Sequence, residues 1–391
     1  MTKTTAAHHS ALRSRLRGLA MLFLVAGIGL LGRQSAALGS VILLTNRSPD
    51  VIPFKVEKQG GGDHEMKLYP QDVISLIVQG PCRMSFDNGK GIQPYLLKPN
   101  TIYFFGHIQD GSGTLDVQEL GLTLPSGKQN LEAEDEEEVQ NGIHLERTED
   151  VGTLTVKIMV DHKEPALQQV WEKRLRKRMA AASKILEETC RLKLDVVEVG
   201  RWNSEKADDF EDALKEFEAE AIPKDIDLVI GFTSRYVSKR GRIRLGGTYG
   251  LFRRHILIRE QHPNTTAPER LEVLLHEIGH TLGAVHSPED VSVMRPNLAD
   301  DKANAAGFRI AFDPVNALAM NLVSESWRFD NARKIEHMSL QTRLGLMNVY
   351  SLMSEAMPGD NSTRGYLNQI GRTFRKSGPR LPRLITDLPP P

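Results

Sequence analysis

The sequence predicts a small all-β domain followed by an α/β (α+β) domain with a twisted, mostly parallel sheet. Two observations carry this prediction. Short apolar runs separated by glycine- and proline-rich turns fill residues 41–125, a pattern typical of a small sandwich. From Gly152 onward, apolar runs of strand length alternate with amphipathic helical segments, which is typical of βα units. A chain of 391 residues has room for two or three domains of this kind.

Residues 1–39 have the layout of a secretory signal peptide. The segment contains five basic residues and no acidic one, and an apolar run of 15 residues occupies 18–32. Small residues follow, and we expect cleavage after Gly39. Because the run is shorter than the roughly 20 residues that span a bilayer as a helix, we expect a secreted or extracytoplasmic protein. The alternative is an uncleaved signal-anchor, and only then would the protein be held at a membrane.

The composition excludes several function classes. Lysine and arginine together number 50, as do aspartate and glutamate, so the zero net charge gives no reason to expect nucleic acid as a partner. The two cysteines, Cys82 and Cys190, are too few for a disulfide scaffold or a cysteine-rich zinc module. We expect two unpaired buried thiols. Two alternatives stay open: a bridge between the two cysteines, or a Cys82 thiolate that blocks a zinc site.

The all-β domain is expected at residues 40–128 and has a sandwich-like pattern. Its clearest strands are the apolar runs at 41–45, 73–78 and 101–105. An acidic linker at 129–149 follows, since six acidic residues within 132–138 repel one another and cannot pack together. Acidic clusters also bind Ca²⁺, but nothing else in this segment indicates a calcium site.

The α/β domain is expected at residues 150–312. It begins with a strand at 153–160 and a long helix at 165–190, whose apolar residues recur every three or four positions. The other predicted elements are strands at 192–199, 226–232, 244–249 and 255–259, and helices at 208–221 and 268–282.

A helical C-terminal extension is expected at residues 313–360. Two apolar-periodic segments, 314–326 and 339–356, supply its helices. The basic and proline-rich segment 361–391 is expected to be a flexible tail.

The most informative stretch begins at His276 and reads HEIGHTLGAVH. His276 and His280 lie four residues apart on a predicted helix, so both imidazoles project from one face and can hold one ion. Glu277 follows His276 and is therefore rotated from it by about 100° around the helix axis. Its carboxylate can reach a water molecule on that ion without ligating it. Gly283 can take positive φ, which ends the helix and lets His286 return to the same ion. Three neutral imidazoles with an open fourth position are typical of a catalytic Zn²⁺ site.

This pattern resembles the metzincin clan of zinc peptidases, whose HExxHxxGxxH motif is followed by a methionine turn. Ser292–Pro296 matches that turn, with Met294 at its centre. The resemblance implies that Met294 forms an apolar base beneath the zinc ligands and that Pro296 begins a wall of the substrate pocket. Gly283 after a leucine and Ser287 after the third histidine are most similar to the matrixin branch. Astacin-like and serralysin-like enzymes carry a tyrosine shortly after this turn, and none lies near Met294.

The resemblance implies a secreted zinc-dependent endopeptidase with one catalytic Zn²⁺ and protein or peptide substrates. Glu277 would activate the zinc-bound water as a general base and pass its proton to the leaving amine. Metzincin substrates lie extended along an edge strand beside the zinc helix. The matching residues here are Leu245, Gly246, Gly247, Thr248 and Tyr249. The two glycines would let another backbone approach closely.

A second function class stays open. The chain could be an exported binding or surface-assembly protein whose β-domain is the working part and whose zinc site is not catalytic. Such a protein would tolerate loss of Glu277, which ligates nothing. Because Glu277 is present, the sequence favours the enzyme. Residues 40–149 are either a removed pro-segment or a retained module.

Overall fold

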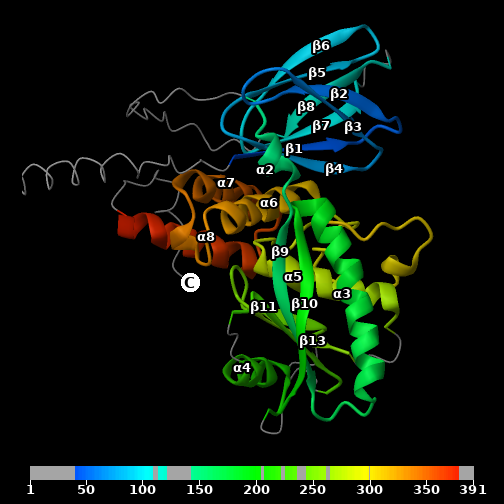
Figure 1. Cartoon of the computed structure of the whole chain (residues 1–391), viewed down its shortest axis with the longest axis vertical. Coiled ribbons are helices and arrows are strands. Elements are labelled where there is room, and N and C mark those ends of the chain that lie inside the picture. The colour runs from blue at the N-terminus through cyan, green and yellow to red at the C-terminus, as the bar shows by residue number, and fades with distance from the viewer. Residues whose placement is uncertain are drawn as a thin grey trace, which may run out of the picture. The chain divides into compact units, whose positions relative to one another are not determined.

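The computed structural model of the chain describes residues 40–108, 113–120, 142–203, 207–221, 225–235, 244–260, 265–298 and 300–377. All of them belong to one compact unit, Gly39–Pro391. The predicted signal peptide at 1–39 lies outside the described residues. Figure 1 shows an all-β part, β1 to β8, and a mixed part that begins with β9. The mixed α/β class with an all-β N-terminal region is therefore confirmed.

The described residues of the all-β part form two four-stranded sheets. The first has the order β4 (Val73–Val78), β1 (Ser40–Asn46), β7 (Thr101–His107), β8 (Leu115–Leu120). The second has the order β3 (Asp63–Leu68), β2 (Ile52–Glu57), β5 (Cys82–Asp87), β6 (Ile92–Leu97). Apolar side chains of both sheets share one buried cluster, which includes Leu44, Phe54 and Phe105. Two sheets with a shared apolar interior make this part a sandwich.

Strand β1 is buried on both faces because the sandwich also packs on C-terminal helices. Ile42 and Leu44 belong to the sandwich core. Val41 and Leu43 alternate with them and contact a second apolar cluster, built mainly by α6 (Pro314–Phe329), α7 (Leu340–Ala356) and α8 (Asn361–Ser377). This double burial explains why β1 is an unbroken apolar run rather than an alternating one.

The predicted acidic linker is shorter than expected at its C-terminal end. Residues 121–141 lie outside the described residues, but the chain is part of the sandwich again from Ile143. Ile143 is fully buried in the sandwich core and bridges to Lys58 and Val78. Helix α2 (Leu145–Glu149) follows directly. A single buried isoleucine after a long charged run has no periodicity, so the pattern of the sequence could not place it.

A five-stranded sheet forms the centre of the mixed part. Its order is β10 (Leu192–Trp202), β9 (Gly152–Asp161), β11 (Leu228–Thr233), β13 (His255–Arg259), β12 (Gly246–Thr248). The first four strands are parallel and β12 is antiparallel to β13, so the predicted mostly parallel sheet is confirmed. The strand predicted at 244–249 is shorter, because the chain turns at Gly250, whose φ is +96°.

Helices cover both faces of this sheet. Side chains of α3 (Gln168–Cys190) and α5 (Ala267–Thr281) share one apolar cluster with the sheet, and those of α4 (Phe210–Glu220) share another. In β11, Ile230 belongs to the first cluster and its neighbour Val229 to the second, as the alternation of side chains along a strand requires. The face covered by α5 is the one that carries the histidine motif.

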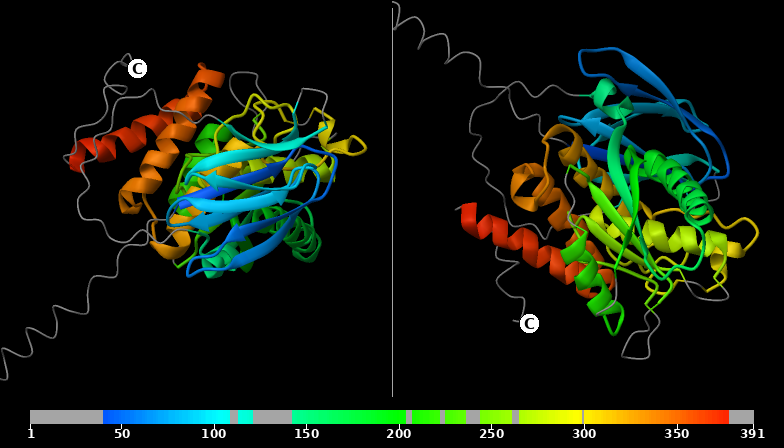
Figure 2. Two further views of the ribbon diagram at one scale, coloured as in Figure 1. Left: turned by 90° about the horizontal axis from the view of Figure 1, so that it is seen from above. Right: turned by 60° about the horizontal axis from the view of Figure 1, so that its bottom comes forward.

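The C-terminal helices complete both parts of the molecule. Met320 of α6 packs in the core of the mixed part, whereas Leu322 packs in the cluster beneath β1. The prediction of a flexible tail is wrong for 361–377, because α8 occupies this segment beside α7 (Figure 2). Tyr366, Ile370 and Phe374 follow one another at intervals of four residues and are buried in the cluster that α7 shares. The rest of the predicted tail lies outside the described residues.

Both cysteines are free and buried, Cys82 in the sandwich core and Cys190 at the end of α3. Burial raises the pKa of each thiol to about 12. The expectation of two unpaired buried thiols is confirmed, and both alternatives, a bridge and a zinc-blocking Cys82, are wrong. Across the part of the chain that the structure describes, no helix is long and apolar enough to cross a membrane.

Candidate metal centre and active site

Helix α5 carries the first two histidines and begins at a capping box. The Thr266 hydroxyl accepts a hydrogen bond from the N–H of Glu269, and the Glu269 carboxylate accepts one from the N–H of Thr266. This start fixes the rotation of the helix, and its period places His276 and His280 on one face, one turn apart. Just past the helix end, Gly283 has a φ of +91°, which bends the chain back toward that face.

The three histidines of the motif converge. His276, His280 and His286 each offer a ring nitrogen within 4.8 Å of the nitrogens of the other two. The Nε2 atoms of His276 and His280 are 3.1 Å apart, and the ring centroid of His286 lies 5.3 Å and 5.1 Å from theirs. In the described ranges, this is the one group of His, Cys, Asp and Glu side chains found able to hold a metal ion.

Each of the three imidazoles is held through its Nδ1 atom. The acceptors are Val293 O at 2.8 Å from His276, Ala284 O at 2.9 Å from His280, and Asp360 Oδ1 at 2.6 Å from His286. Carbonyl and carboxylate oxygens accept hydrogen bonds, so each Nδ1 carries the proton. The lone pair of each neutral ring is therefore on Nε2, where a metal would be bound.

Burial keeps two of the histidines neutral. Burial first, and then the charges of His280 and His286, lower the pKa of His276 well below its usual value. Burial and the charge of His286 lower the pKa of His280 to about 4. Neutral imidazole is the form that ligates a metal. The donor set and its tautomers therefore fit one Zn²⁺ with three nitrogen ligands and an open fourth position.

Glu277 lies next to this face with 7% of its surface exposed. Burial raises the pKa of its carboxyl group to about 7, although the positive charges of Arg244 and His286 oppose the shift. A carboxyl group with a pKa near neutrality can both accept and release a proton at neutral pH. The environment of Glu277 therefore suits a general base that later acts as an acid.

Strand β12 forms a sheet edge beside Glu277. Among the described strands it pairs with β13 alone, so no described strand covers its other side. A Cβ built on Gly246 would lie 2.6 Å from Glu277 Cγ. Of the predicted substrate-binding residues, Gly246, Gly247 and Thr248 form this edge. Leu245 packs partly against the core, and Tyr249 is 42% exposed beyond the strand end.

Met294 is fully buried beneath α5. Its Sδ atom would lie 2.8 Å from a Cβ at Gly279, so the methionine occupies the space that a larger residue on the helix would need. The N–H of Ser287 donates to the carbonyl of Met294 at 2.9 Å, which ties the turn to the segment just after His286. Pro296, the predicted start of a pocket wall, is exposed.

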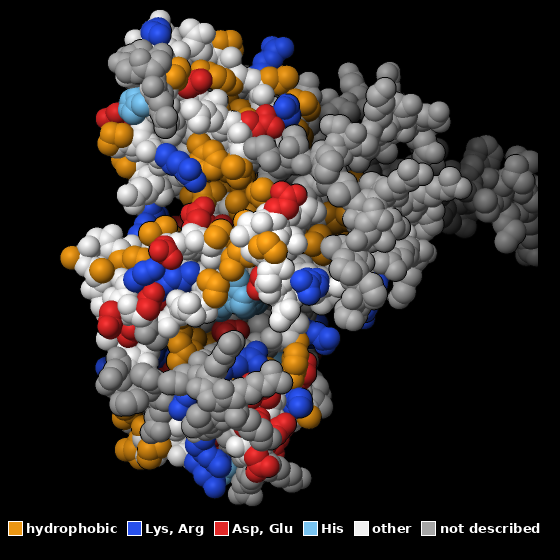
Figure 3. Space-filling view, turned by 180° about the vertical axis from the view of Figure 1, so that it is seen from behind, with side chains coloured by type: hydrophobic (Ala, Val, Ile, Leu, Met, Phe, Trp, Pro, Cys, Tyr) orange, Lys and Arg blue, Asp and Glu red, His pale blue; other side chains and the backbone are white. Residues whose placement is uncertain are grey.

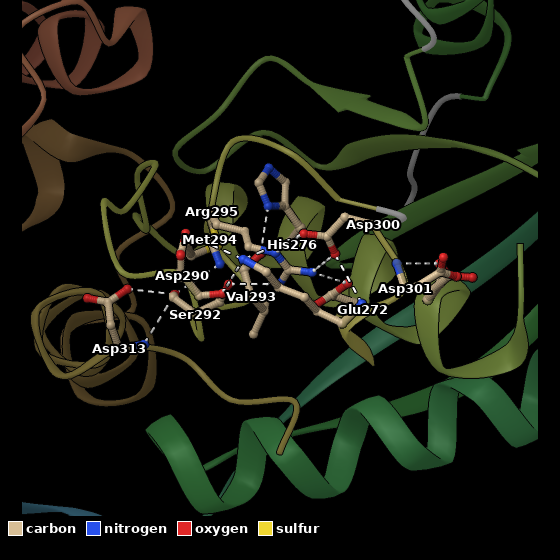
Figure 4. A network of polar contacts seen from close by, with 12 residues as sticks. Glu272, His276, Asp290, Ser292, Val293, Met294, Arg295, Asp300, Asp301 and Asp313 are labelled. Atoms are coloured by element: carbon tan, nitrogen blue, oxygen red, sulfur yellow. Dashed lines mark hydrogen bonds and ion pairs between the residues drawn. The ribbon is translucent and has the colours of Figure 1, made fainter. Parts of the chain in front are cut away.

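A polar network that the sequence did not predict fixes the turn around Met294 (Figure 4). Arg295 is buried and makes a bidentate ion pair with the buried Glu272, one helical turn before His276. Arg295 also pairs with Asp300 at 2.7 Å. On the other side of the turn, Ser292 donates to Asp313 at 2.7 Å. Together these contacts hold the carbonyl of Val293 against His276.

The C-terminal helices also reach the site, and sequence reasoning missed them. Tyr350 of α7 donates to the carbonyl of Gly283 at 2.7 Å, and Tyr366 of α8 donates to that of His280 at 2.8 Å. Both tyrosines are buried, and each hydroxyl uses its single proton in this hydrogen bond. The only local signal was the Asp-Asn-Ser-Thr sequence that begins at Asp360, which is typical of a helix start.

Comparison with known proteins supports a peptidase. Residues 153–308 match the Reprolysin_5 model, whose description is metallopeptidase family M12. This segment is similar to zinc metallopeptidases. It includes the three histidines, Glu277 and Met294, so the match and the converging side chains point to the same site. The match is to M12 and gives no support to the matrixin branch.

No curated protein matches the chain. Among solved structures, the archaemetzincin of Methanopyrus kandleri is similar with a TM-score of 0.33 and 16% sequence identity, over 44% of this chain and 95% of that one. A chaperone–substrate complex is similar with a TM-score of 0.34 and 9% identity, over 73% of this chain and 42% of that one. At these scores neither similarity decides a function.

Proposed function

We propose that this chain is a zinc-dependent endopeptidase that cleaves extended segments of protein or peptide substrates. One observation carries the proposal: three imidazoles converge with every Nδ1 committed elsewhere, and the carboxyl group of Glu277 lies beside them. A purely structural zinc site closes its fourth position with another ligand, and the described residues offer none. Glu277 would then be the general base.

The residues divide the reaction between them. A zinc ion held by His276, His280 and His286 would lower the pKa of a water molecule and polarise the scissile carbonyl. Glu277 would accept a proton from that water and deliver it to the leaving amine. Its pKa near 7 suits both transfers, and its burial keeps bulk water from competing for the proton.

The substrate would bind as an added strand on β12. A peptide that pairs with this open edge would be held by backbone hydrogen bonds, which select an extended conformation rather than a particular side chain. Gly246 lets that backbone lie close to Glu277, because a side chain there has no room. On the face shown in Figure 3, histidine side chains reach the surface among hydrophobic and acidic ones.

Two finer assignments belong to the same proposal. We propose secretion on the layout of residues 1–39, with the basic segment, the apolar run and the small residues before Gly39 as its support. Gly283 after Leu282 and Ser287 after the third histidine favour the matrixin branch within the metzincin clan.

The test compares wild type with Glu277→Ala on a broad peptide library, with bound zinc measured in both proteins. We expect Glu277→Ala to keep its zinc and to lose about 10²–10⁴-fold in kcat/KM. Glu188→Ala, which removes a half-exposed carboxylate from α3, is the matched control and should cleave like wild type. Equal cleavage by wild type and Glu277→Ala would exclude the mechanism. A zinc-loaded wild type that cleaves nothing would favour the exported binding protein instead.

A further inference from the structure

Asp360 stands between the end of α7 and the start of α8, 74 residues after His286, yet the two side chains are in contact. We propose that Asp360 is a positioning residue of the zinc site, through which helix α8 fixes the tautomer and the orientation of His286. The inference rests on the proposed function, since it concerns the same metal. It makes the C-terminal segment a required part of the centre rather than an extension of it.

The two carboxylate oxygens of Asp360 accept hydrogen bonds from different donors. Oδ1 accepts a hydrogen bond from His286 Nδ1 at 2.6 Å. Oδ2 accepts from the N–H of Thr363 at 2.7 Å, from its hydroxyl at 2.8 Å, and from the hydroxyl of Ser362. Only 5% of the Asp360 side chain is exposed. The carboxylate is thus a helix cap on one side and a histidine acceptor on the other, and it has no freedom to turn away.

His286 needs this support more than the other two histidines. His276 and His280 are fixed by the α5 backbone, whereas His286 lies in the segment that follows the bend at Gly283, with 29% of its side chain exposed. It is also the one histidine of the three whose Nδ1 faces a carboxylate rather than a backbone carbonyl. A carboxylate acceptor both fixes the ring and makes Nε2 a stronger donor to a metal.

Helix α8 is itself fastened to the site. Tyr366 lies on α8, after Asp360 in the sequence. Its hydroxyl donates a hydrogen bond to the carbonyl of His280. The ring of Tyr366 fills the space at Gly250, where a Cβ would come within 2.7 Å of it. The position of Asp360 is therefore set by contacts with the same segment that carries the ligands, and a shift of α8 would move His286.

The test is Asp360→Asn in the full-length chain. Asparagine is a good helix cap, so it should keep α8 in place. Because three donors face Oδ2, the amide oxygen belongs on that side, and the amide N–H₂ must face His286 Nδ1. That arrangement favours the wrong tautomer, with the proton on Nε2. We expect zinc to bind about 10–100-fold more weakly, measured by competition with a chelator.

The matched control is the double variant Ser362→Ala, Thr363→Val. It removes two bonds to Oδ2 and leaves the bond between Asp360 and His286 intact. We expect it to lower the stability of the metal-free protein while its zinc affinity stays near that of wild type. Two further readouts separate positioning from mere stability: the ¹⁵N shifts of His286, which report its tautomer, and the absorption spectrum of the Co²⁺-substituted protein, which reports the ligand geometry.

Each outcome decides the proposal. Weaker zinc binding and an altered tautomer in Asp360→Asn, with both unchanged in the control, support it. Wild-type affinity and spectra in Asp360→Asn would overturn it, and so would an equal loss of affinity in the control. If the wild type binds zinc but cleaves no peptide, the proposed peptidase function is rejected. The zinc affinities and spectra of the variants then still decide the role of Asp360. A wild type that binds no zinc would reject both.

Discussion

Gly246 of β12 and Glu277 of α5 lie so close together that a Cβ on Gly246 would be 2.6 Å from Glu277 Cγ and 2.7 Å from its Oε1. Real Cβ atoms essentially never approach other atoms this closely. The backbone at Gly246 therefore lies directly against the side chain of the proposed general base. A peptide paired with β12 would meet Glu277 without an intervening side chain.

Substitution of Gly246 by alanine tests this closeness. We expect Gly246→Ala to push the Glu277 carboxylate aside and to lower kcat/KM about 10²-fold, because displacements of about 1 Å at a catalytic group cost that much. Zinc content should not change, since Glu277 is not a ligand. Peptide cleavage and bound zinc are measured together.

Gly247→Ala is the matched control. A Cβ on Gly247 would meet the guanidinium of Arg244 at 2.9 Å, the far end of a flexible side chain that can move away. We expect this variant to lose less activity than Gly246→Ala, because its Cβ does not meet Glu277. Equal losses in the two variants would mean that the edge strand, rather than the contact with Glu277, limits the rate.

The buried carboxyl group of Glu277 should make the metal-free protein sensitive to pH. Its folded-state pKa is about 7 and its usual value is 4.5, because burial disfavours the charged form. Folding then favours the protonated group, so this contribution to stability is present below about pH 4.5 and is lost as the pH rises toward 7 and beyond. Glu277→Gln has no such loss.

We therefore expect Glu277→Gln to gain stability over wild type as the pH is raised from 5 to 8, by about 3 kcal/mol at most. The measurement is urea unfolding of both proteins after zinc removal with a chelator. A constant difference between the two proteins across this range would show that burial does not shift the pKa in this way. In the zinc-loaded protein the cation would favour the carboxylate and reduce the difference.

Local patterns were sufficient to predict that the three histidines converge. His276 and His280 are one turn apart on a helix, and the bend at Gly283 returns the chain to them, so the three histidines could be placed without knowledge of distant contacts. Strands β1 and β4 were predicted because most of their residues are apolar, and these residues are buried in the sandwich core and against the C-terminal helices. Strand β3 was missed, since it reads DHEMKL and has an exposed face at the sheet edge.

Contacts between distant segments could not be predicted. Asp360 and Tyr366 lie more than 70 residues after the histidines whose side chain or carbonyl they bond, His286 and His280. The pattern of α8 was also misleading, because its apolar positions are few and basic residues lie among them. The packing of Tyr366, Ile370 and Phe374 on α7 stabilises this segment as a helix.

The ion pair between Arg295 and Glu272 should be a major source of stability at the methionine turn. Arg295 is 3% exposed and Glu272 is fully buried, so removal of one partner leaves an uncompensated charge. We expect Arg295→Ala to lower the free energy of unfolding of the metal-free protein by about 3–5 kcal/mol. Urea unfolding monitored by circular dichroism gives this value.

A surface pair provides the comparison for this prediction. Arg176 pairs with Glu172 at 2.9 Å on α3, but its side chain is 43% exposed. Arg176→Ala should therefore cost only about 0–1 kcal/mol. If Arg295→Ala cost no more than Arg176→Ala, the buried network would not be what holds the turn beneath His276.

Alanine substitutions at Gly283 and Gly307 separate the cost of backbone strain from the cost of crowding. Its φ of +91° already disfavours a side chain, and a Cβ there would also meet Val323 at 2.9 Å and the Tyr350 hydroxyl at 3.0 Å. Gly307 has a similar φ of +83° but lies exposed with open space around it. The two glycines therefore differ in crowding and hardly in conformation.

We expect Gly307→Ala to cost about 1–2 kcal/mol of stability, the strain of a left-handed alanine, with no change in zinc affinity. Gly283→Ala should cost more, because Tyr350 must release the Gly283 carbonyl, a hydrogen bond worth about 1 kcal/mol. The bend also directs His286 back to His276 and His280, so Gly283→Ala should bind zinc more weakly as well. Equal stability losses and equal zinc affinities in the two variants would show that the bend needs only a left-handed residue and that the contact with Tyr350 does not hold the third ligand in place.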